Sequence, residues 1–188
     1  LTMEITLQLD ALPPTYAAML VPHYHSLEDC LSDVAPVMIH PLFLCEMMDR
    51  VILDCTKNNL EQKENRFFVS GNPEALLMLE VRASDPAALE IEIKKVQQTL
   101  RKSGRSYASP VLHGPDIPKA VSLRKAGLGL LGNMIGDRKA VACIEDTAVA
   151  LKDLKDFIME FSRIMARYDQ KAVYYAHAGA GELHLRPI

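Results

Sequence analysis

Apolar residues recur at helical spacing along a stretch near the C-terminal end of the chain. Between residues 152 and 168 they fall at positions i, i+3, i+4 and i+7, the pattern of a helix with one buried face. This pattern predicts a helix over 152–168 whose apolar stripe belongs to the core. The stripe consists of Leu154, Phe157, Ile158, Phe161, Ile164, Met165 and Tyr168.

A second long helix is predicted after Asp85-Pro86, because Asp caps helices well and Pro suits the first helical turn. Gly104 would end it, since glycine readily adopts the left-handed conformation that follows many helices. Its buried face would consist of Leu89, Ile93, Val96 and Leu100. Further helices are predicted over 26–37, 48–56 and 117–125.

Shorter segments carry the β-branched, aromatic and alternating apolar residues that are typical of strands. Because they alternate with the helices, we expect an α+β fold of ferredoxin-like strand-helix-strand repeats, with a mostly antiparallel sheet and the helices on one face. Polar residues 57–66 lack periodicity and predict a loop between two halves. The predicted strands cover 4–9, 16–24, 42–48, 76–82, 107–112, 140–144, 173–177 and 182–186.

The last two predicted strands, 173–177 and 182–186, would form a hairpin, because a Gly-rich turn separates them. Side chains alternate between the two faces of a strand. Glu182, His184 and Arg186 therefore share one face, while the leucines between them point to the other. We expect one polar face and one core face.

The hairpin also brings two histidines together. An even-numbered loop centred on Ala180 and Gly181 would place His177 and His184 directly opposite each other on one face, whereas an odd-numbered loop would separate them. Directly opposed imidazoles can reach one metal ion or one substrate oxygen. Alternatively, the two histidines are merely half-exposed polar residues. A catalytic zinc usually has about three protein ligands, and no third ligand follows the pair in this sequence.

Gly127, Gly129 and Gly132 match the letters of the dinucleotide-binding motif G-x-G-x-x-G. That motif needs a strand before it and a long helix after it, and neither is predicted here. We therefore expect a flexible loop over a ligand pocket rather than a Rossmann site.

Glu145 and Asp146 are adjacent carboxylates at the end of a predicted strand. Neighbouring residues of a strand point to opposite faces, so at most one of them can face a pocket. A paired acid/base role is therefore not predicted for them.

Composition narrows the class of protein. The chain has 188 residues, of which 49% are hydrophobic and 24% charged, as expected of one domain with a sizeable core. A net charge of -3 gives no electrostatic basis for binding nucleic acid. Because the sequence has no long apolar run, we expect a cytoplasmic protein. If the chain belongs to a longer parent protein, other parts of that protein could attach it to the surface of a membrane.

Three motifs resemble one family. The run His177-Ala-Gly-Ala-Gly-Glu-Leu-His-Leu-Arg-Pro resembles the motif H-x-G-D-G-N-L-H of FAD-linked oxidases of the vanillyl-alcohol-oxidase type. Glu145-Asp-Thr-Ala-Val and Ser122-Leu-Arg-Lys resemble the family's E-D-x-A-V-P and L-R-E/K segments. Members include D-lactate dehydrogenase, the flavin subunit of glycolate oxidase and D-2-hydroxyglutarate dehydrogenase.

The resemblance implies that residues 1–188 are the cap, or substrate, domain of a larger oxidoreductase whose FAD-binding domain lies outside this chain. It also implies that Arg124 binds a substrate carboxylate, with His177 and His184 beside the hydroxyl-bearing carbon. Arg186, on the polar face of the hairpin, is a further candidate for that carboxylate. In some relatives such a histidine pair holds a divalent metal such as zinc.

The chain departs from the family motif at two positions: Ala180 replaces the usual Asp, and Glu182 replaces an Asn that can lie near the flavin. Glu182 is therefore a candidate flavin contact with altered chemistry.

The leading hypothesis is a flavin-dependent dehydrogenase that oxidises a small 2-hydroxy acid with hydride transfer to FAD. One imidazole would accept the hydroxyl proton, or a metal on both would polarise the hydroxyl group. The alternative is a non-catalytic α/β module that binds a small ligand or pairs subunits, and a homo-oligomer is left open.

Overall fold

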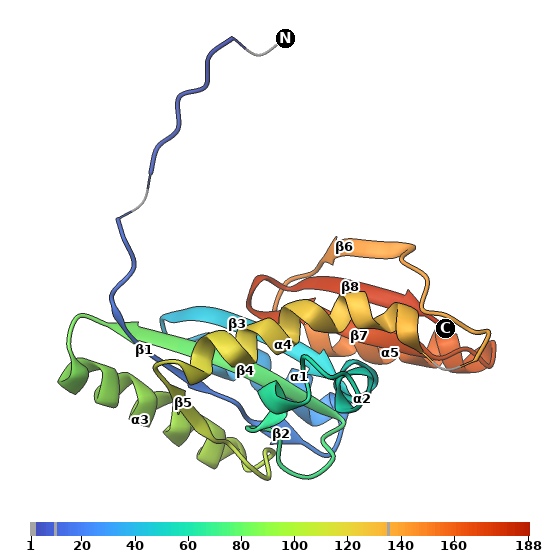
Figure 1. Cartoon of the computed structure of the whole chain (residues 1–188), viewed down its shortest axis with the longest axis horizontal. Coiled ribbons are helices and arrows are strands. Elements are labelled where there is room, and N and C mark those ends of the chain that lie inside the picture. The colour runs from blue at the N-terminus through green and yellow to red at the C-terminus, as the bar shows by residue number, and fades with distance from the viewer. Residues whose placement is uncertain (1–2, 10, 135) are drawn as a thin grey trace.

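The computed structural model describes residues 3–9, 11–134 and 136–188 and shows an α+β fold around one sheet (Figure 1). The strands are β1 (Tyr16–Leu20), β2 (His23–Tyr24), β3 (Leu42–Asp49), β4 (Ala75–Ala83), β5 (Val111–His113), β6 (Ile144–Ala148), β7 (Ala172–His177) and β8 (Glu182–Pro187). Their order across the sheet is β5-β1-β4-β3-β7-β8-β6, and β2 pairs with β4. All of these pairings are antiparallel, so the predicted α+β class with a mostly antiparallel sheet is confirmed.

The helices begin and end largely where the capping residues predict. The Ser26 hydroxyl accepts a hydrogen bond from the backbone N–H of Asp29 at 3.0 Å, and the Asp85 carboxylate accepts one from Ala88 at 2.8 Å. Gly104 ends its helix with φ of 66°. The helices are α1 (Leu27–Val37), α2 (Arg50–Lys57), α3 (Pro86–Ser103), α4 (Asp116–Leu130) and α5 (Leu154–Arg167), with short 3-10 turns η1 (Glu64–Arg66), η2 (Leu131–Asn133) and η3 (Ala178–Ala180). Within the described ranges, no helix combines the length and apolar character that crossing a membrane requires.

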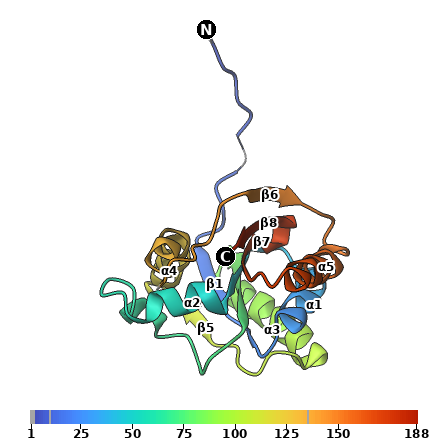
Figure 2. The same ribbon diagram turned by 90° about the vertical axis from the view of Figure 1, so that its right-hand side faces the viewer.

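The helices cover both faces of the sheet, so the prediction that they lie on one face is wrong (Figure 2). Helices α1, α3 and α5 pack on one face, and α2 and α4 pack on the other. The reason lies in the central strand β4, where the consecutive residues Leu76 and Leu77 are both fully buried. Consecutive residues point to opposite faces, so both faces of this strand need apolar cover.

Three predicted strands have different bounds in the structure. The segment 16–24 is interrupted at Pro22, which has no N–H to donate to a ladder, and it forms the separate strands β1 and β2. Of the segments predicted over 107–112 and 140–144, only the C-terminal ends belong to the strands β5 and β6, which begin at Val111 and Ile144. As a result Glu145 and Asp146 lie inside strand β6 rather than after it. Ala108 also forms an isolated β-bridge with His23.

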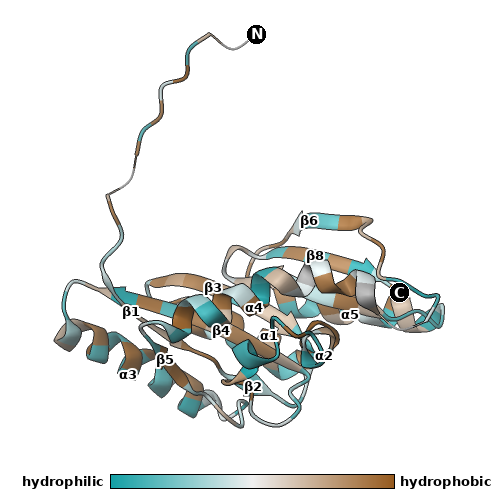
Figure 3. Cartoon of the chain, viewed as in Figure 1, coloured by the Kyte–Doolittle hydropathy of each residue, from teal (hydrophilic) through white to brown (hydrophobic). Residues whose placement is uncertain are grey.

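The strand predicted over 4–9 is absent from the described residues. Residues 3–9 lead away from the sheet as an extended segment, and apolar and polar residues alternate along it (Figures 1 and 3). Met3 is 87% exposed and Ile5 is 70% exposed. Alternation produces a strand only where a partner strand is within reach, and no described strand pairs with this segment.

The three glycines of the G-x-G-x-x-G match do not form a loop. Gly127 and Gly129 lie within α4, and Gly132 lies in the 3-10 turn that follows it. A Cβ atom at Gly127 would lie 2.4 Å from Cγ2 of Ile52 in α2. Gly127 therefore permits a close approach of two helices, and the prediction of a flexible loop is corrected.

The apolar stripe of α5 belongs to the core only in part. Leu154 and Ile158 are fully buried, and Phe161 packs against them. Ile164 and Tyr168, one and two turns further along, are 42% and 69% exposed. Phe157, in the first half of the helix, is also 38% exposed, so the predicted stripe is wider than the face of α5 that packs on the core.

Candidate functional site

The histidine pair lies on one face of the β7–β8 hairpin, as predicted, but in a different register. His177 is opposite Glu182, and His184 is opposite Tyr175. The two histidines are therefore diagonal neighbours and not the directly opposed partners that were predicted. The reason is that the loop between the strands consists of residues 178–181 and is not centred on Ala180 and Gly181. The imidazole rings still approach closely, with centroids 5.4 Å apart and planes at 73°.

The turn between the two strands sets this register, and the conformation of the turn depends on Gly181. Residues Ala178–Ala180 form a 3-10 turn, and Gly181 follows in the left-handed region with φ of 70°. The carbonyl oxygen of Gly181 accepts a hydrogen bond from Val149 at 3.0 Å. A Cβ atom at this position would lie 2.1 Å from the carbonyl oxygen of Val149, so only glycine fits here.

A buried carboxylate on the neighbouring strand β3 contacts the first histidine. Oε1 of Glu46 lies 3.0 Å from Nδ1 of His177, and Oε2 forms an ion pair with Nη2 of Arg124. The Glu46 residue is only 9% exposed. Glu46 thus holds a predicted catalytic residue and a predicted substrate-binding residue at the same time.

Arg124 is almost completely buried between α4 and the sheet, with 8% of its surface exposed. Its guanidinium carbon lies 4.1 Å from the centroid of the Tyr175 ring, and the Tyr175 hydroxyl donates to the Arg124 carbonyl oxygen at 3.1 Å. Nε of Arg124 is buried without a hydrogen-bond partner in the described part of the chain. The side chain is therefore held firmly, with part of its hydrogen-bonding capacity unused.

A second carboxylate contacts the other histidine from strand β6. Oε2 of Glu145 lies 2.7 Å from Nδ1 of His184, and Oε1 accepts a hydrogen bond from Nε of Arg186 at 2.6 Å. Burial raises the pKa of the Glu145 carboxyl, but the hydrogen bonds from Arg186 and His184 outweigh it, so the pKa is lowered overall. Glu145 is thus kept ionised at neutral pH.

The backbone of β6 is irregular at this point. Asp146 has a positive φ of 56°, and the register between β6 and β8 shifts between Ile144 and Thr147. This distortion brings an Asp146 oxygen to 3.4 Å from Nδ1 of His184, on the same side as Glu145. The prediction that only one of the two carboxylates can face the site is therefore wrong, because it assumed a regular strand.

The five residues proposed from the sequence, His177, His184, Arg124, Arg186 and Glu182, all belong to this one site. A donor atom from each of His177, Glu182 and His184 lies within 4.8 Å of the others, so together they can serve as metal ligands. A cavity of about 470 Å³ opens beside Glu46, His177 and Glu182. The sequence predicts no third ligand after the pair, but Glu182, which lies between the two histidines in the chain, can supply one.

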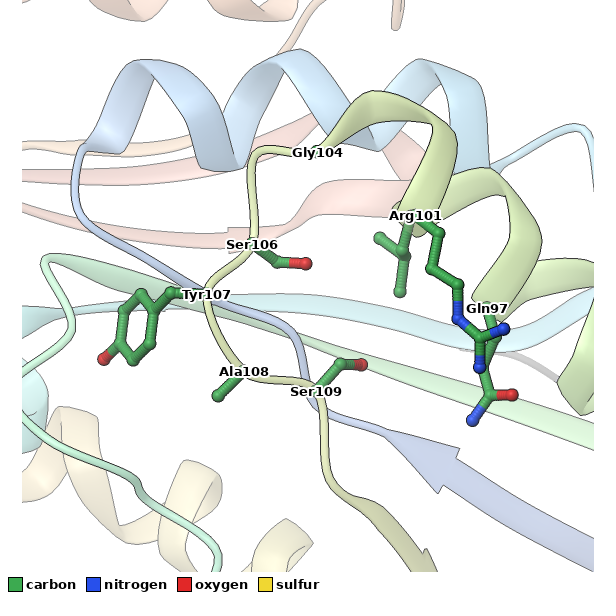
Figure 4. Close-up of a pocket in the computed structure, with 8 residues that line it drawn as sticks. Gln97, Arg101, Gly104, Ser106, Tyr107, Ala108 and Ser109 are labelled. Atoms are coloured by element: carbon green, nitrogen blue, oxygen red, sulfur yellow. The ribbon is translucent and has the colours of Figure 1, made fainter.

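A separate pocket of about 350 Å³ lies at the C-terminal end of α3 (Figure 4). Arg101, Gln97, Ser106 and Ser109 contribute polar groups to it. Arg101 is the one charged residue among its lining side chains, and the negative end of the α3 dipole disfavours an anion there. The titratable groups that chemistry requires are therefore at the hairpin and not at this pocket.

Glu46 and Glu145 were missed in the sequence. Glu46 does carry a signal, because it is a lone carboxylate within the apolar strand Leu42-Phe-Leu-Cys-Glu-Met-Met, and buried carboxylates need partners. Glu145 does stand in a segment that resembles a family motif, but no residue pattern predicts its contact with His184 or the irregular backbone at Asp146.

Comparison with known proteins agrees with this geometry. Residues 13–188 match the family described as FAD linked oxidases, C-terminal domain. D-2-hydroxyglutarate dehydrogenase from Pseudomonas putida is 27% identical over 188 residues, which cover 96% of this chain and 19% of that protein. The enzyme of the same name from Escherichia coli is 25% identical over 195 residues, covering 98% and 19%. The chain thus spans about a fifth of the length of these relatives.

The fold is also similar to that of a solved structure. Part of p-cresol methylhydroxylase, solved with substrate bound, superimposes with a TM-score of 0.60 at 11% identity and covers 94% of this chain and 39% of that one. The sequence match extends over nearly the whole chain, and the fold and the hairpin motif agree with it. This chain belongs to the FAD-linked oxidases, as their C-terminal domain.

Proposed function

We propose that the chain is the substrate-binding cap of an FAD-dependent dehydrogenase that oxidises a small 2-hydroxy carboxylate. The main support is the arrangement of His177 and His184 beside Arg124 and Arg186 on one polar face of the hairpin. The two relatives named D-2-hydroxyglutarate dehydrogenase support the class of substrate. The FAD-binding domain would belong to the same polypeptide.

The charge of the site favours a divalent metal such as zinc between the histidines. Four carboxylates and two guanidinium groups surround the pair, which leaves two excess negative charges when all are ionised. An anionic substrate would be repelled by this excess, and a divalent cation would neutralise it. His177, Glu182 and His184 would hold the metal, and it would supply a Lewis acid at the substrate hydroxyl. The charged groups are Glu46, Glu145, Asp146, Glu182, Arg124 and Arg186.

The two arginines would orient the substrate carboxylate. Each is already paired with a carboxylate, Arg124 with Glu46 and Arg186 with Glu145. A guanidinium group has five N–H donors, so each pairing leaves donors for a second carboxylate. The side chain of Arg186 is 18% exposed and that of Arg124 is 9% exposed, so Arg186 is the more accessible of the two.

Oxidation of a 2-hydroxy acid removes one proton from the hydroxyl group and one hydride from the adjacent carbon. When bound, FAD supplies the hydride acceptor. In a metal-free site, Nε2 of His177 or His184 would accept the hydroxyl proton, because Nδ1 of each ring faces a carboxylate. Glu182 would lie close to both the substrate and the flavin.

The decisive experiment is His177→Ala in the full-length parent protein, purified with its FAD. We expect 2-hydroxy acid oxidation to fall by a factor of about 100 or more while the FAD content stays unchanged, because a group at the reacting centre is removed. His113→Ala is the matched control, since His113 is an exposed histidine on β5 at the opposite edge of the sheet. Unchanged oxidation in the His177→Ala protein would contradict the proposal and favour a non-catalytic module.

A further inference from the structure

Each imidazole of the pair meets its own carboxylate, and each carboxylate also holds an arginine. Glu46 contacts Nδ1 of His177 and pairs with Arg124. Glu145 contacts Nδ1 of His184 and pairs with Arg186. The same arrangement thus occurs twice, and the two carboxylates come from strands β3 and β6 on opposite sides of the hairpin.

At His184 the surroundings demand an N–H at Nδ1. Its two nearest polar neighbours there are carboxylate oxygens, Glu145 at 2.7 Å and Asp146 at 3.4 Å. An ionised carboxylate can only accept hydrogen bonds. If Nδ1 had no hydrogen, its lone pair would be repelled by two negatively charged carboxylates. The hydrogen of the neutral ring therefore lies on Nδ1.

At His177 two neighbours make opposite demands on Nδ1. The Glu46 oxygen at 3.0 Å needs a hydrogen on Nδ1, whereas Nη2 of Arg124 at 3.3 Å can only donate to a bare lone pair. The carboxylate contact is shorter and would be charge-assisted. Nη2 of Arg124 also has other acceptors, because it pairs with Glu46 and lies 3.4 Å from the carbonyl oxygen of Ala176. The balance favours the hydrogen on Nδ1 of His177.

We propose that Glu46 and Glu145 are positioning residues that fix His177 and His184 in the same tautomer, with the hydrogen on Nδ1 and the lone pair on Nε2. The inference deepens the proposed function, since it assigns the residues that prepare both imidazoles for a metal or a hydroxyl proton. A carboxylate behind a histidine fixes the orientation of the ring and makes its other nitrogen more basic.

The arrangement also links binding to chemistry. Each carboxylate holds one arginine, which orients the substrate, and one histidine, which acts on it. A shift of either carboxylate therefore moves both groups together. Positioning of both groups to within about 0.5 Å is what such sites require.

The first test is the tautomeric state of both histidines in the 188-residue chain, labelled with 15N at histidine. Long-range 1H–15N spectra at about pH 8.5, where free imidazole is neutral, distinguish the two tautomers directly. We expect both His177 and His184 to carry the hydrogen on Nδ1. A hydrogen on Nε2 of His177 would overturn the role of Glu46, and the same result at His184 would overturn that of Glu145. This measurement needs no variant to fold.

The second test removes each carboxylate in turn. In Glu46→Gln we expect the tautomer preference to be lost at His177 alone, and in Glu145→Gln at His184 alone. With Co²⁺ as a spectroscopic probe, each variant should bind the metal about 10- to 100-fold more weakly, the usual loss when the partner of a ligating histidine is removed. Glu80→Gln is the matched control, since Glu80 is 3% exposed on the neighbouring strand and pairs with Arg82, not with a histidine.

The outcomes separate this inference from the proposed function. If Glu80→Gln changes the histidine signals as much as the other two substitutions, the effect is one of general charge and the positioning role is overturned. If both tautomers are as proposed but His177→Ala leaves the parent protein fully active, Glu46 and Glu145 keep their role on the imidazoles and the proposed function fails.

Discussion

The carboxylate of Asp49 accepts a hydrogen bond from the backbone N–H of Tyr174, 125 residues further along the chain, at 2.8 Å. The other oxygen of Asp49 accepts from the backbone N–H of Ile52 at 3.0 Å and caps helix α2. One buried side chain thus fastens α2 to β7, the strand that carries Tyr175 and His177. The frame behind the candidate site depends on this contact.

We predict that Asp49 makes the stability of the chain depend on pH. Burial raises the pKa of its carboxyl from 3.8 to about 7. The folded chain therefore binds this proton more tightly than the unfolded chain does. The stabilising contribution is complete below pH 3.8 and is lost as the pH rises to 7, by an amount on the order of 4 kcal/mol.

The measurement is urea denaturation between pH 4 and 8 for the natural chain and for Asp49→Asn. The difference between the two free energies of unfolding isolates Asp49 from the other carboxylates. We expect the natural chain to lose stability relative to the variant as the pH rises. A difference that does not vary with pH would show that the pKa of Asp49 is not raised.

Gly181→Ala should destabilise the chain by about 2–5 kcal/mol. The substitution places a Cβ atom 2.1 Å from the carbonyl oxygen of Val149 and forces alanine into φ of 70°. Thermal unfolding is the measurement. Gly129→Ala serves as the control, because its Cβ atom would meet nothing within 4 Å and helix propensity predicts a gain of about 0.5–1 kcal/mol. Equal effects at the two glycines would refute the tight contact at Gly181.

Two isoleucines of α5 should differ sharply in their contribution to stability. Ile158 is fully buried, so Ile158→Ala should cost about 2–5 kcal/mol. Ile164 is 42% exposed, so Ile164→Ala should change the free energy of unfolding by less than about 0.5 kcal/mol. Denaturant titration of both variants checks this. A large loss in Ile164→Ala would mean that the C-terminal half of α5 is covered in solution.

Zinc should stabilise the natural chain through the histidine pair. At a free zinc concentration 100 times the Kd, binding to the folded state alone adds about 2.7 kcal/mol to the free energy of unfolding. A chelator should reverse the gain, and His184→Ala should abolish it. An equal gain in His184→Ala would place the metal elsewhere, and His113→Ala should bind zinc as the natural chain does.

Arg124→Lys in the parent protein should lower kcat/KM by about 10- to 100-fold, equivalent to about 1.4–2.7 kcal/mol. Lysine keeps the positive charge but cannot contact Glu46 and a substrate carboxylate with one planar group. The control is Lys125→Arg, a change at the exposed neighbouring position on α4, which should leave kcat/KM within a factor of about two. Full activity in Arg124→Lys would remove Arg124 from the substrate site.

The common face of His177 and His184 follows from the alternation of side chains along the two strands once the loop between them has an even number of residues, as it does here. Their diagonal register was not predictable, since it depends on the 3-10 turn and on the conformation of Gly181, which the count of loop residues does not determine. Glu145 and Asp146 were misjudged for a related reason: the rule of alternation fails where a backbone is irregular. Pairings between distant strands, such as Glu46 on β3 with His177 on β7, follow from the order of strands in the sheet, and local patterns carry no information on that order.

The buried face of α3 was predicted correctly because four apolar residues at helical spacing had to face the sheet. The exposed part of α5 shows the limit of the same rule. An apolar stripe predicts which residues of a helix can be buried together. The size of the surface that the helix packs against determines how many of them are actually buried.

The extended residues 3–9 have a consequence for handling the chain. Their apolar side chains are exposed and no described strand pairs with them, so we expect copies of the chain to self-associate through this segment at high concentration. A version that starts at Ala11 keeps every strand of the sheet and should stay monodisperse at concentrations where the natural chain self-associates. We therefore expect self-association and folding stability to depend on different parts of the described chain.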